Sequence, residues 1–158
     1  MNLINATIGF LAIALLALTG VYTGQDQNSA SAASGEGILR LTAVDVQTHS
    51  EGNDLGDHRT FNKIVLGSDG FIIGAAVDAC TIVGEGSNYG KNGLSLCNGV
   101  YTLPKGKLTF QGTRRTRQRY TFVITGGSGI YENAGGVLNG FQTSSSPFSQ
   151  RVIIHIGR

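Results

Sequence analysis

The stretch YTFVITGGSGIYENAGG, residues 120–136, decides the fold, because it connects an apolar segment to a glycine-rich turn. A glycine-rich loop binds phosphate when a helix follows it, since the N–H groups at the helix N-terminus donate to phosphate oxygens. Gly127 and Gly129 fit the first two positions of a G-x-G-x-x-G pattern, but Glu132 stands at the third. The next segment, AGGVLNGFQ at 134–142, has the pattern of a strand. The stretch therefore predicts a tight turn between two strands, in which glycines take positive φ or let two backbones pack closely.

Further strands are expected on both sides of this turn, because alternating segments are separated by turn residues and no helical period follows Gly37. The segment 71–83 is almost entirely apolar, which predicts burial on both of its faces. About eight short strands predict an antiparallel barrel or sandwich, and a closed barrel has an interior for one small ligand. The expected strands are residues 38–48, 60–66, 71–83, 94–103, 107–112, 119–125, 134–142 and 150–156.

The composition indicates one globular domain with a leader. Apolar residues make up 41% of the 158 residues, which is enough for one core. The chain has 24 Gly and only 2 Pro. Average Gly usage is about 7%, so this excess predicts many tight turns between short strands. The formal net charge of +2 does not point to a nucleic-acid-binding protein.

Residues 1–25 carry no charged side chain, and their apolar core, 6–22, is at the short end for a membrane-spanning helix. Residues 26–37 have the composition of a polar linker, and ASA at 30–32 fits a signal-peptidase site. The leader is expected to be a cleaved export signal, an uncleaved anchor or a helix that covers the domain as a lid. We therefore expect a barrel domain over 38–158 and a protein that is secreted or tethered to a membrane.

Five short motifs occur in order over residues 38–156, and together they resemble the superfamily of allene oxide cyclases and dirigent proteins. They are LGD at 55–57, FNK at 61–63, AC at 79–80, GKLTFQG at 106–112 and FVITGGSGIYENAGG at 122–136. The resemblance implies an eight-stranded antiparallel β-barrel with an apolar cavity, no cofactor, and a homo-oligomer such as a dimer or trimer. Plant members cyclise a fatty-acid epoxide, some bacterial members close polyketide rings, and dirigent members steer radical coupling.

The resemblance also implies site residues. The carboxylate, asparagine and cysteine that line the barrel in the cyclases match Asp45, Asn62 and Cys80. Judged from its side-chain chemistry alone, Asp45 either faces the interior or faces outward into solvent. In the interior, burial would raise its pKa or require a hydrogen-bond donor beside it. Asp78 shares a strand face with Cys80, because the two residues are two positions apart. Asp78 is therefore either a second acid of the site, working with Asp45, or a structural hydrogen-bonding group.

Cys80 and Cys97 occupy symmetric positions on the two arms of one expected hairpin. Such positions lie opposite each other, so we expect a disulfide, with a free Cys80 thiol as the alternative. A disulfide would make Cys80 a wall of the pocket and not a nucleophile. The candidate aromatic walls of the pocket are Tyr101, Phe110, Tyr120, Phe122 and Phe141.

The run RRTRQR at 114–119 is expected to be a solvated hairpin end, with binding of an anionic group as the alternative. His49, His58 and His155 show no metal-ligand spacing, and no metal site is expected.

These observations predict a cofactor-free cyclase or isomerase that folds an apolar, polyunsaturated substrate for stereocontrolled ring closure, with Asp45, Asn62 and Asp78 as catalytic residues. The substrate class is an allene oxide or a polyketide-type polyene. The alternative is a non-catalytic, exported barrel that is dirigent-like or binds a small ligand. Both interpretations imply an apolar small molecule as the partner and no nucleic acid.

Overall fold

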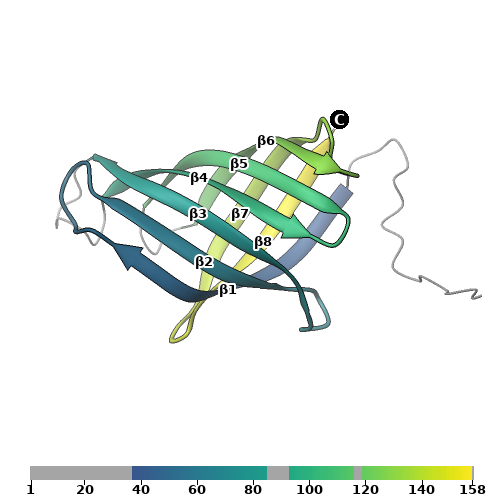
Figure 1. Cartoon of the computed structure of the whole chain (residues 1–158), viewed down its shortest axis with the longest axis horizontal. Coiled ribbons are helices and arrows are strands. Elements are labelled where there is room, and N and C mark those ends of the chain that lie inside the picture. Colours follow the sequence, from purple (N-terminus) through teal and green to yellow (C-terminus); the bar gives the residue numbers. More distant parts are fainter. Residues whose placement is uncertain (1–36, 85–92, 116–118, 158) are drawn as a thin grey trace, which may run out of the picture.

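A computed structural model describes residues 37–84, 93–115 and 119–157, which form eight antiparallel strands in one closed barrel (Figure 1). Each strand pairs with its neighbour in the chain, and β1 pairs with β8 to close the barrel. The strands are β1 (Gly37–Ser50), β2 (His58–Leu66), β3 (Ile72–Gly84), β4 (Leu94–Leu103), β5 (Gly106–Arg115), β6 (Tyr120–Gly129), β7 (Gly135–Ser145) and β8 (Phe148–Gly157). The all-β prediction is therefore confirmed, and closure distinguishes the barrel from the sandwich.

The predicted leader, 1–25, and all but the last residue of the predicted linker, 26–37, lie outside the described residues. Within the described ranges, no helix has the length and apolarity needed to cross a bilayer.

The stretch at 120–136 forms β6, a tight turn and the start of β7, as predicted. Gly129 has φ +65°, and a Cβ at this position would overlap the backbone of Lys105. Glycine is needed there because an L side chain would be strained and would overlap the backbone of the β4–β5 turn. No helix follows the turn, so this loop lacks the helix N-terminus of a phosphate-binding site.

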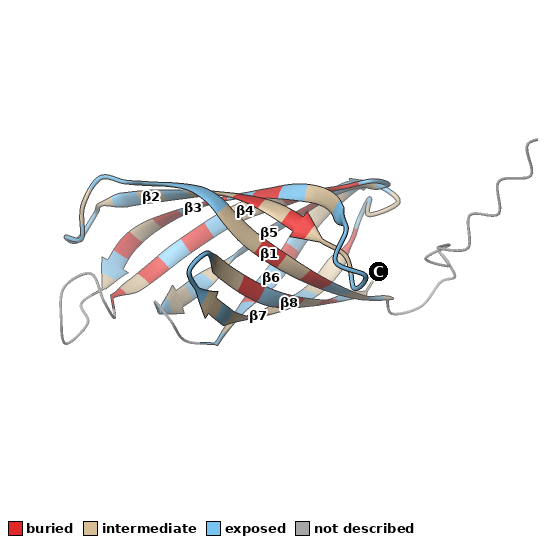
Figure 2. Ribbon diagram, turned by 90° about the horizontal axis from the view of Figure 1, so that it is seen from below, coloured by how far each residue is buried: buried red, intermediate tan, exposed pale blue. Residues whose placement is uncertain are grey.

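Burial alternates along the strands, which Figure 2 shows as bands of buried and exposed residues. In β3, Ala76, Asp78 and Cys80 are buried, whereas Val77 between them is 44% exposed. The prediction that this strand is buried on both faces is wrong. In a barrel each strand has one inner face, and the outer face of β3 carries small apolar residues in contact with solvent.

Several glycines lie inside strands, where they make room for aromatic rings. A Cβ at Gly99, Gly112 or Gly140 would overlap the ring of Phe110, Phe122 or Tyr120, respectively. The same rings form a continuous stack with Tyr101, with centroid separations of 5.4 Å (Tyr101–Phe110), 5.3 Å (Phe110–Phe122) and 4.6 Å (Phe122–Tyr120). The glycine excess therefore serves ring packing in the barrel as well as the turns that were predicted from it.

The barrel interior is divided into two halves. The half that contains the β2–β3, β4–β5 and β6–β7 turns is filled by aliphatic side chains, which include Leu41, Val65, Leu108, Leu138, Val152 and Ile154. At the boundary of this core, Lys63 of β2 forms a buried ion pair with Asp78 of β3, and both side chains are at most 3% exposed. The other half is open and contains the cavity described below.

The predicted disulfide is present between Cys80 and Cys97. The two residues are paired directly across β3 and β4, and their Cα atoms are 4.1 Å apart. The bond connects two strands at the open half of the barrel.

Replacing Lys63 with Met is expected to lower the free energy of unfolding by about 3 kcal/mol, because it leaves the Asp78 carboxylate buried without its closest cation. A Lys63→Met/Asp78→Leu double variant should recover at least half of this loss, since it buries no charge. Urea denaturation measures both effects, with Lys107→Met on the exposed face of β5 as the control. A single variant as stable as the control would contradict the role given to the ion pair.

Reduction of the disulfide, or a Cys80→Ala/Cys97→Ala variant, should lower the free energy of unfolding by about 3 kcal/mol, because the bond closes a loop with a sequence separation of 17. The measurement is urea denaturation with and without dithiothreitol. Identical transitions under the two conditions would show that the bond does not stabilise the barrel.

Candidate functional site

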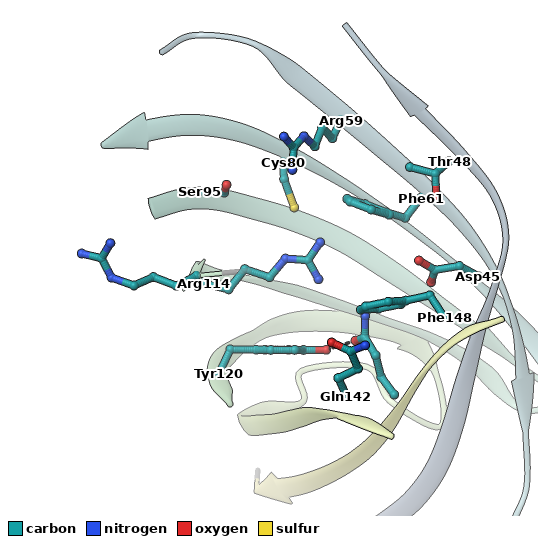
Figure 3. Close-up of a pocket in the computed structure, with 12 residues that line it drawn as sticks. Asp45, Thr48, Arg59, Phe61, Cys80, Ser95, Arg114, Tyr120, Gln142 and Phe148 are labelled. Carbon is teal, nitrogen blue, oxygen red and sulfur yellow. Dashed lines mark hydrogen bonds between the residues drawn. The ribbon is translucent and has the colours of Figure 1, made fainter. Parts of the chain in front are cut away.

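A cavity of about 210 Å³ occupies the open half of the barrel and is lined by residues from all eight strands (Figure 3). Its apolar walls are the rings of Phe61, Tyr120 and Phe148. Charged side chains also reach it, with Asp45 on one side and Arg114 on the opposite side in Figure 3. The site is therefore an apolar pocket with a few polar groups that converge on it, which is the common composition of a small-molecule site.

Asp45 faces the interior of the barrel. It lies opposite Lys63, just before an irregularity in the pairing of β1 with β2, and its Oδ1 atom is buried without a hydrogen-bond partner. Burial raises the pKa of the Asp45 carboxyl above its ordinary value of 3.8, Lys63 opposes this rise, and the negative charge of Asp78 adds to it. The structure thus excludes the outward-facing alternative and presents a carboxyl group to the cavity.

Asp78 lies on the same face as Cys80, as predicted, but its partners are cations. The carboxylate forms the ion pair with Lys63, and its Oδ2 atom lies 3.8 Å from Nη2 of Arg114. The contacts of Asp78 are thus ion contacts with two basic side chains. It holds two cations at the inner end of the cavity.

Arg114 corrects the prediction that the whole arginine run is a solvated hairpin end. Its side chain is only 13% exposed and lies between two rings, with Cζ 4.7 Å from the centroid of Phe61 and 5.8 Å from that of Tyr120. Arg119 instead lies on the outer surface over the ring of Phe141, which is therefore not a wall of the cavity. Residues 116–118 lie outside the described part of the chain.

Tyr120 connects Arg114 to β8. Its hydroxyl group donates to Oε1 of the buried Gln150 and interacts with the Arg114 guanidinium. Burial raises the pKa of Tyr120 and of Tyr101, and Arg114 offsets only part of the rise for Tyr120. Both phenols are therefore neutral at physiological pH and able to donate hydrogen bonds.

Asn62 does not reach the cavity, which corrects its predicted placement. It lies on the outer face of β2, where its Nδ2 atom donates to Oε1 of Gln47 at 3.3 Å. Its neighbours Phe61 and Lys63 point inward instead, because successive residues of a strand face opposite sides. The resemblance assigned a polar, inward-facing residue to position 62, but the polar side chain that faces inward is that of Lys63.

The other predicted residues fall into two groups. Cys80 and Tyr120 line the cavity, and Cys80 does so as half of the disulfide. Tyr101, Phe110 and Phe122 are buried in the ring stack and do not line the cavity.

Sequence reasoning missed Arg59, Phe61, Arg114 and Phe148 as cavity residues. Alternation in HRTFNKIVL at 58–66 contains the signal for the first two, because they share a face with the buried Lys63. In the described ranges, no group of three or more His, Cys, Asp or Glu side chains is arranged to hold a metal ion.

The structure is similar to solved barrels of several activities. A pyocyanin demethylase superposes with a TM-score of 0.64 at 23% identity, over 73% of this chain and 97% of that one. A Diels–Alderase from Streptomyces koyangensis superposes with a TM-score of 0.62 at 18% identity, over 77% of this chain and 63% of that one. A pterocarpan synthase dirigent protein gives a TM-score of 0.64 at 10% identity, over 78% and 96% of the two chains.

No protein-family model matches the sequence, and no curated protein matches it at a significant level. The likeness is therefore one of fold. The chain has the closed eight-stranded barrel of dirigent proteins and Diels–Alderase cyclases, in agreement with the allene oxide cyclase and dirigent resemblance of its motifs.

Proposed function

We propose that the protein is a cofactor-free cyclase or isomerase that folds an apolar, unsaturated substrate in the barrel cavity for stereocontrolled ring closure. The observation that carries this proposal is Asp45, whose buried Oδ1 atom lacks a partner and whose side chain lines a pocket with aromatic rings as its apolar walls. A buried polar atom without a partner costs free energy, which a substrate oxygen at this position offsets. The substrate is of the allene oxide or polyketide-type polyene class.

The size of the cavity limits the part of the substrate that is enclosed. Pockets for whole drug-sized ligands have volumes of about 300–1,000 Å³, and this cavity has about 210 Å³. The barrel thus encloses the reacting portion, and the rest of a long substrate extends through the open end. Holding a flexible chain in one reactive shape removes part of the entropic barrier to ring closure.

The polar groups have separate roles in this proposal. In its protonated form Asp45 donates a hydrogen bond to a carbonyl or epoxide oxygen of the substrate, and the Arg114 guanidinium binds a negatively charged or polar group of the substrate. Asp78 acts as a positioning residue, since its ion contacts hold Lys63 and Arg114 in place. Asn62 has no role in this mechanism, because it lies on the outer surface.

A non-catalytic dirigent-like barrel is the second candidate. Its support is the superposition on the pterocarpan synthase dirigent protein, which covers 96% of that chain. We propose that in either role the protein works in an oxidising compartment, secreted or membrane-tethered. The Cys80–Cys97 disulfide supports this location.

The test is chiral analysis of the product formed when an eighteen-carbon allene oxide, or in parallel a linear polyene with a tethered dienophile, reacts beside the purified full chain. An enriched enantiomer is expected with one of the two substrates. Asp45→Asn should lower the enzymatic rate on the order of 100-fold, because it removes a general acid. Glu132→Gln is the matched control. Glu132 is exposed in the β6–β7 turn, at the end of the barrel opposite the cavity, and its substitution should change neither the rate nor the handedness of the product.

A racemic product at the no-protein rate with both substrates would contradict catalysis. The dirigent alternative predicts that product handedness changes only when an external one-electron oxidase supplies radicals.

The rate should also depend on pH through Asp45. Because burial raises the pKa of this carboxyl above 3.8, the protonated form persists above that pH, and the rate should fall as the pH rises through the raised pKa. The folded state binds this proton more tightly than the unfolded state, so the free energy of unfolding should fall in the same pH window. Rate and urea profiles over about pH 4 to 8 measure both effects. In Asp45→Asn, neither the rate nor the free energy of unfolding should show this fall with pH. An unchanged pH profile in this variant would assign the titration to another group.

A further inference from the structure

Basic side chains outnumber acidic ones around the cavity. The cations are Arg59, Lys63, Arg114 and Arg115, and the acids are Asp45 and Asp78. Lys63 is matched by its ion pair with Asp78, and Arg115 lies at the exposed rim. Arg59, Lys63 and Arg114 therefore exceed Asp45 and Asp78 by one positive charge even when both carboxyl groups are ionised. Such a charge is costly in a partly desolvated pocket unless an anion balances it.

Arg114 is held in position, but its hydrogen-bonding capacity is only partly used. The rings of Phe61 and Tyr120 contact its guanidinium, and a hydrogen bond to the Tyr120 hydroxyl uses one of its donors. The 3.8 Å contact with Asp78 is a charge interaction longer than a hydrogen bond. A guanidinium has five N–H donors in a planar fork, which fits a carboxylate through two parallel hydrogen bonds. Arg114 thus presents an ordered donor surface to the cavity.

Arg59 supplies a second, independent observation. Its Nη2 atom donates to the oxygen of Gly52 at 3.4 Å and to Oδ1 of Asn53, which fixes the side chain to the segment between β1 and β2. Its Nε atom is buried without a hydrogen-bond partner, and the side chain lines the cavity. A buried donor without a partner next to an open pocket is where a ligand acceptor binds with most gain.

We propose that Arg59 and Arg114 form a subsite for one carboxylate of the substrate, so that the substrate is a conjugated or aromatic carboxylic acid. This inference rests on the proposed function and adds the substrate class and its orientation. A singly charged, planar group can accept from the Arg114 fork and from the free Nε of Arg59, whereas a phosphate dianion would exceed the single unbalanced positive charge of the site. The carboxylate then lies against Arg59 and Arg114, and the apolar body lies along Phe61, Tyr120 and Phe148 with its reacting bonds toward Asp45.

The experiment compares two probes of the same shape, 2-naphthoate and the neutral 2-naphthamide, by isothermal titration calorimetry on the full chain. The wild-type protein should bind 2-naphthoate at least about tenfold more tightly than 2-naphthamide, because only the carboxylate pairs with the two arginines. Arg114→Gln and Arg59→Gln should each remove most of this preference by weakening naphthoate binding, with little change for naphthamide. Arg151→Gln, on the exposed outer face of β8, is the control and should leave both affinities unchanged.

Arg114→Lys is a second test, for the case that the glutamine variants do not fold. It should retain part of the preference, because lysine keeps the charge but cannot form the planar fork. Circular dichroism confirms the fold of each variant.

Two results would overturn the inference, and they are distinguishable. Equal wild-type affinity for the two probes, or an equal loss for both in Arg114→Gln and Arg59→Gln, would remove the carboxylate subsite and leave the cavity as an apolar binding site. Binding of neither probe would contradict the cavity as a ligand site and with it the proposed function.

Discussion

The buried ion pair between Lys63 and Asp78 is the constraint on which the open half of the barrel depends. Two charges in a barrel interior are costly unless they are paired and surrounded by further polar groups. Asp78 accordingly also attracts Arg114, and Lys63 lies directly opposite Asp45 in the β1–β2 pairing. One pair of oppositely charged residues thus sets where the aliphatic core ends, brings an arginine inside the barrel and determines the electrostatic environment of the carboxyl group that faces the cavity.

The packing of aromatic rings against glycines is the second constraint on the barrel interior. Aromatic side chains fill the barrel beneath the cavity only because the facing positions on neighbouring strands are glycines, such as Gly99 beneath Phe110 and Gly140 beneath Tyr120. The stack ends at Tyr120, whose hydroxyl is fixed by Gln150 and whose ring contacts Arg114. Tyr120 therefore joins one apolar wall of the cavity to one of its charged groups, Arg114.

The sequence was sufficient for features that depend on local pattern. Period-two alternation and turn residues predicted an antiparallel barrel or sandwich, and the resemblance of the motifs implied the closed barrel. Hairpin symmetry predicted the Cys80–Cys97 disulfide. The sequence was insufficient where the placement of a side chain depends on the exact register of its strand or on contacts with strands that are distant in the sequence. Asn62 was placed inward, but a shift of one residue exchanges the two faces of a strand and brings Lys63 inside instead. Arg114 could not be separated from its run, because its partners Asp78 and Phe61 lie on strands that only barrel closure brings near it.

The central claim is that this ion-pair network presents a partly buried, protonatable Asp45 to a cavity that takes an anionic ligand. A carbon-13 NMR pH titration of the Asp45 side-chain carboxyl, in the free full chain and with 2-naphthoate, tests it most directly. The account predicts a pKa above the ordinary 3.8 in the free protein and a further rise when the anion binds nearby. A carboxyl group that titrates at or below its ordinary pKa, with no response to the probe, would contradict the account.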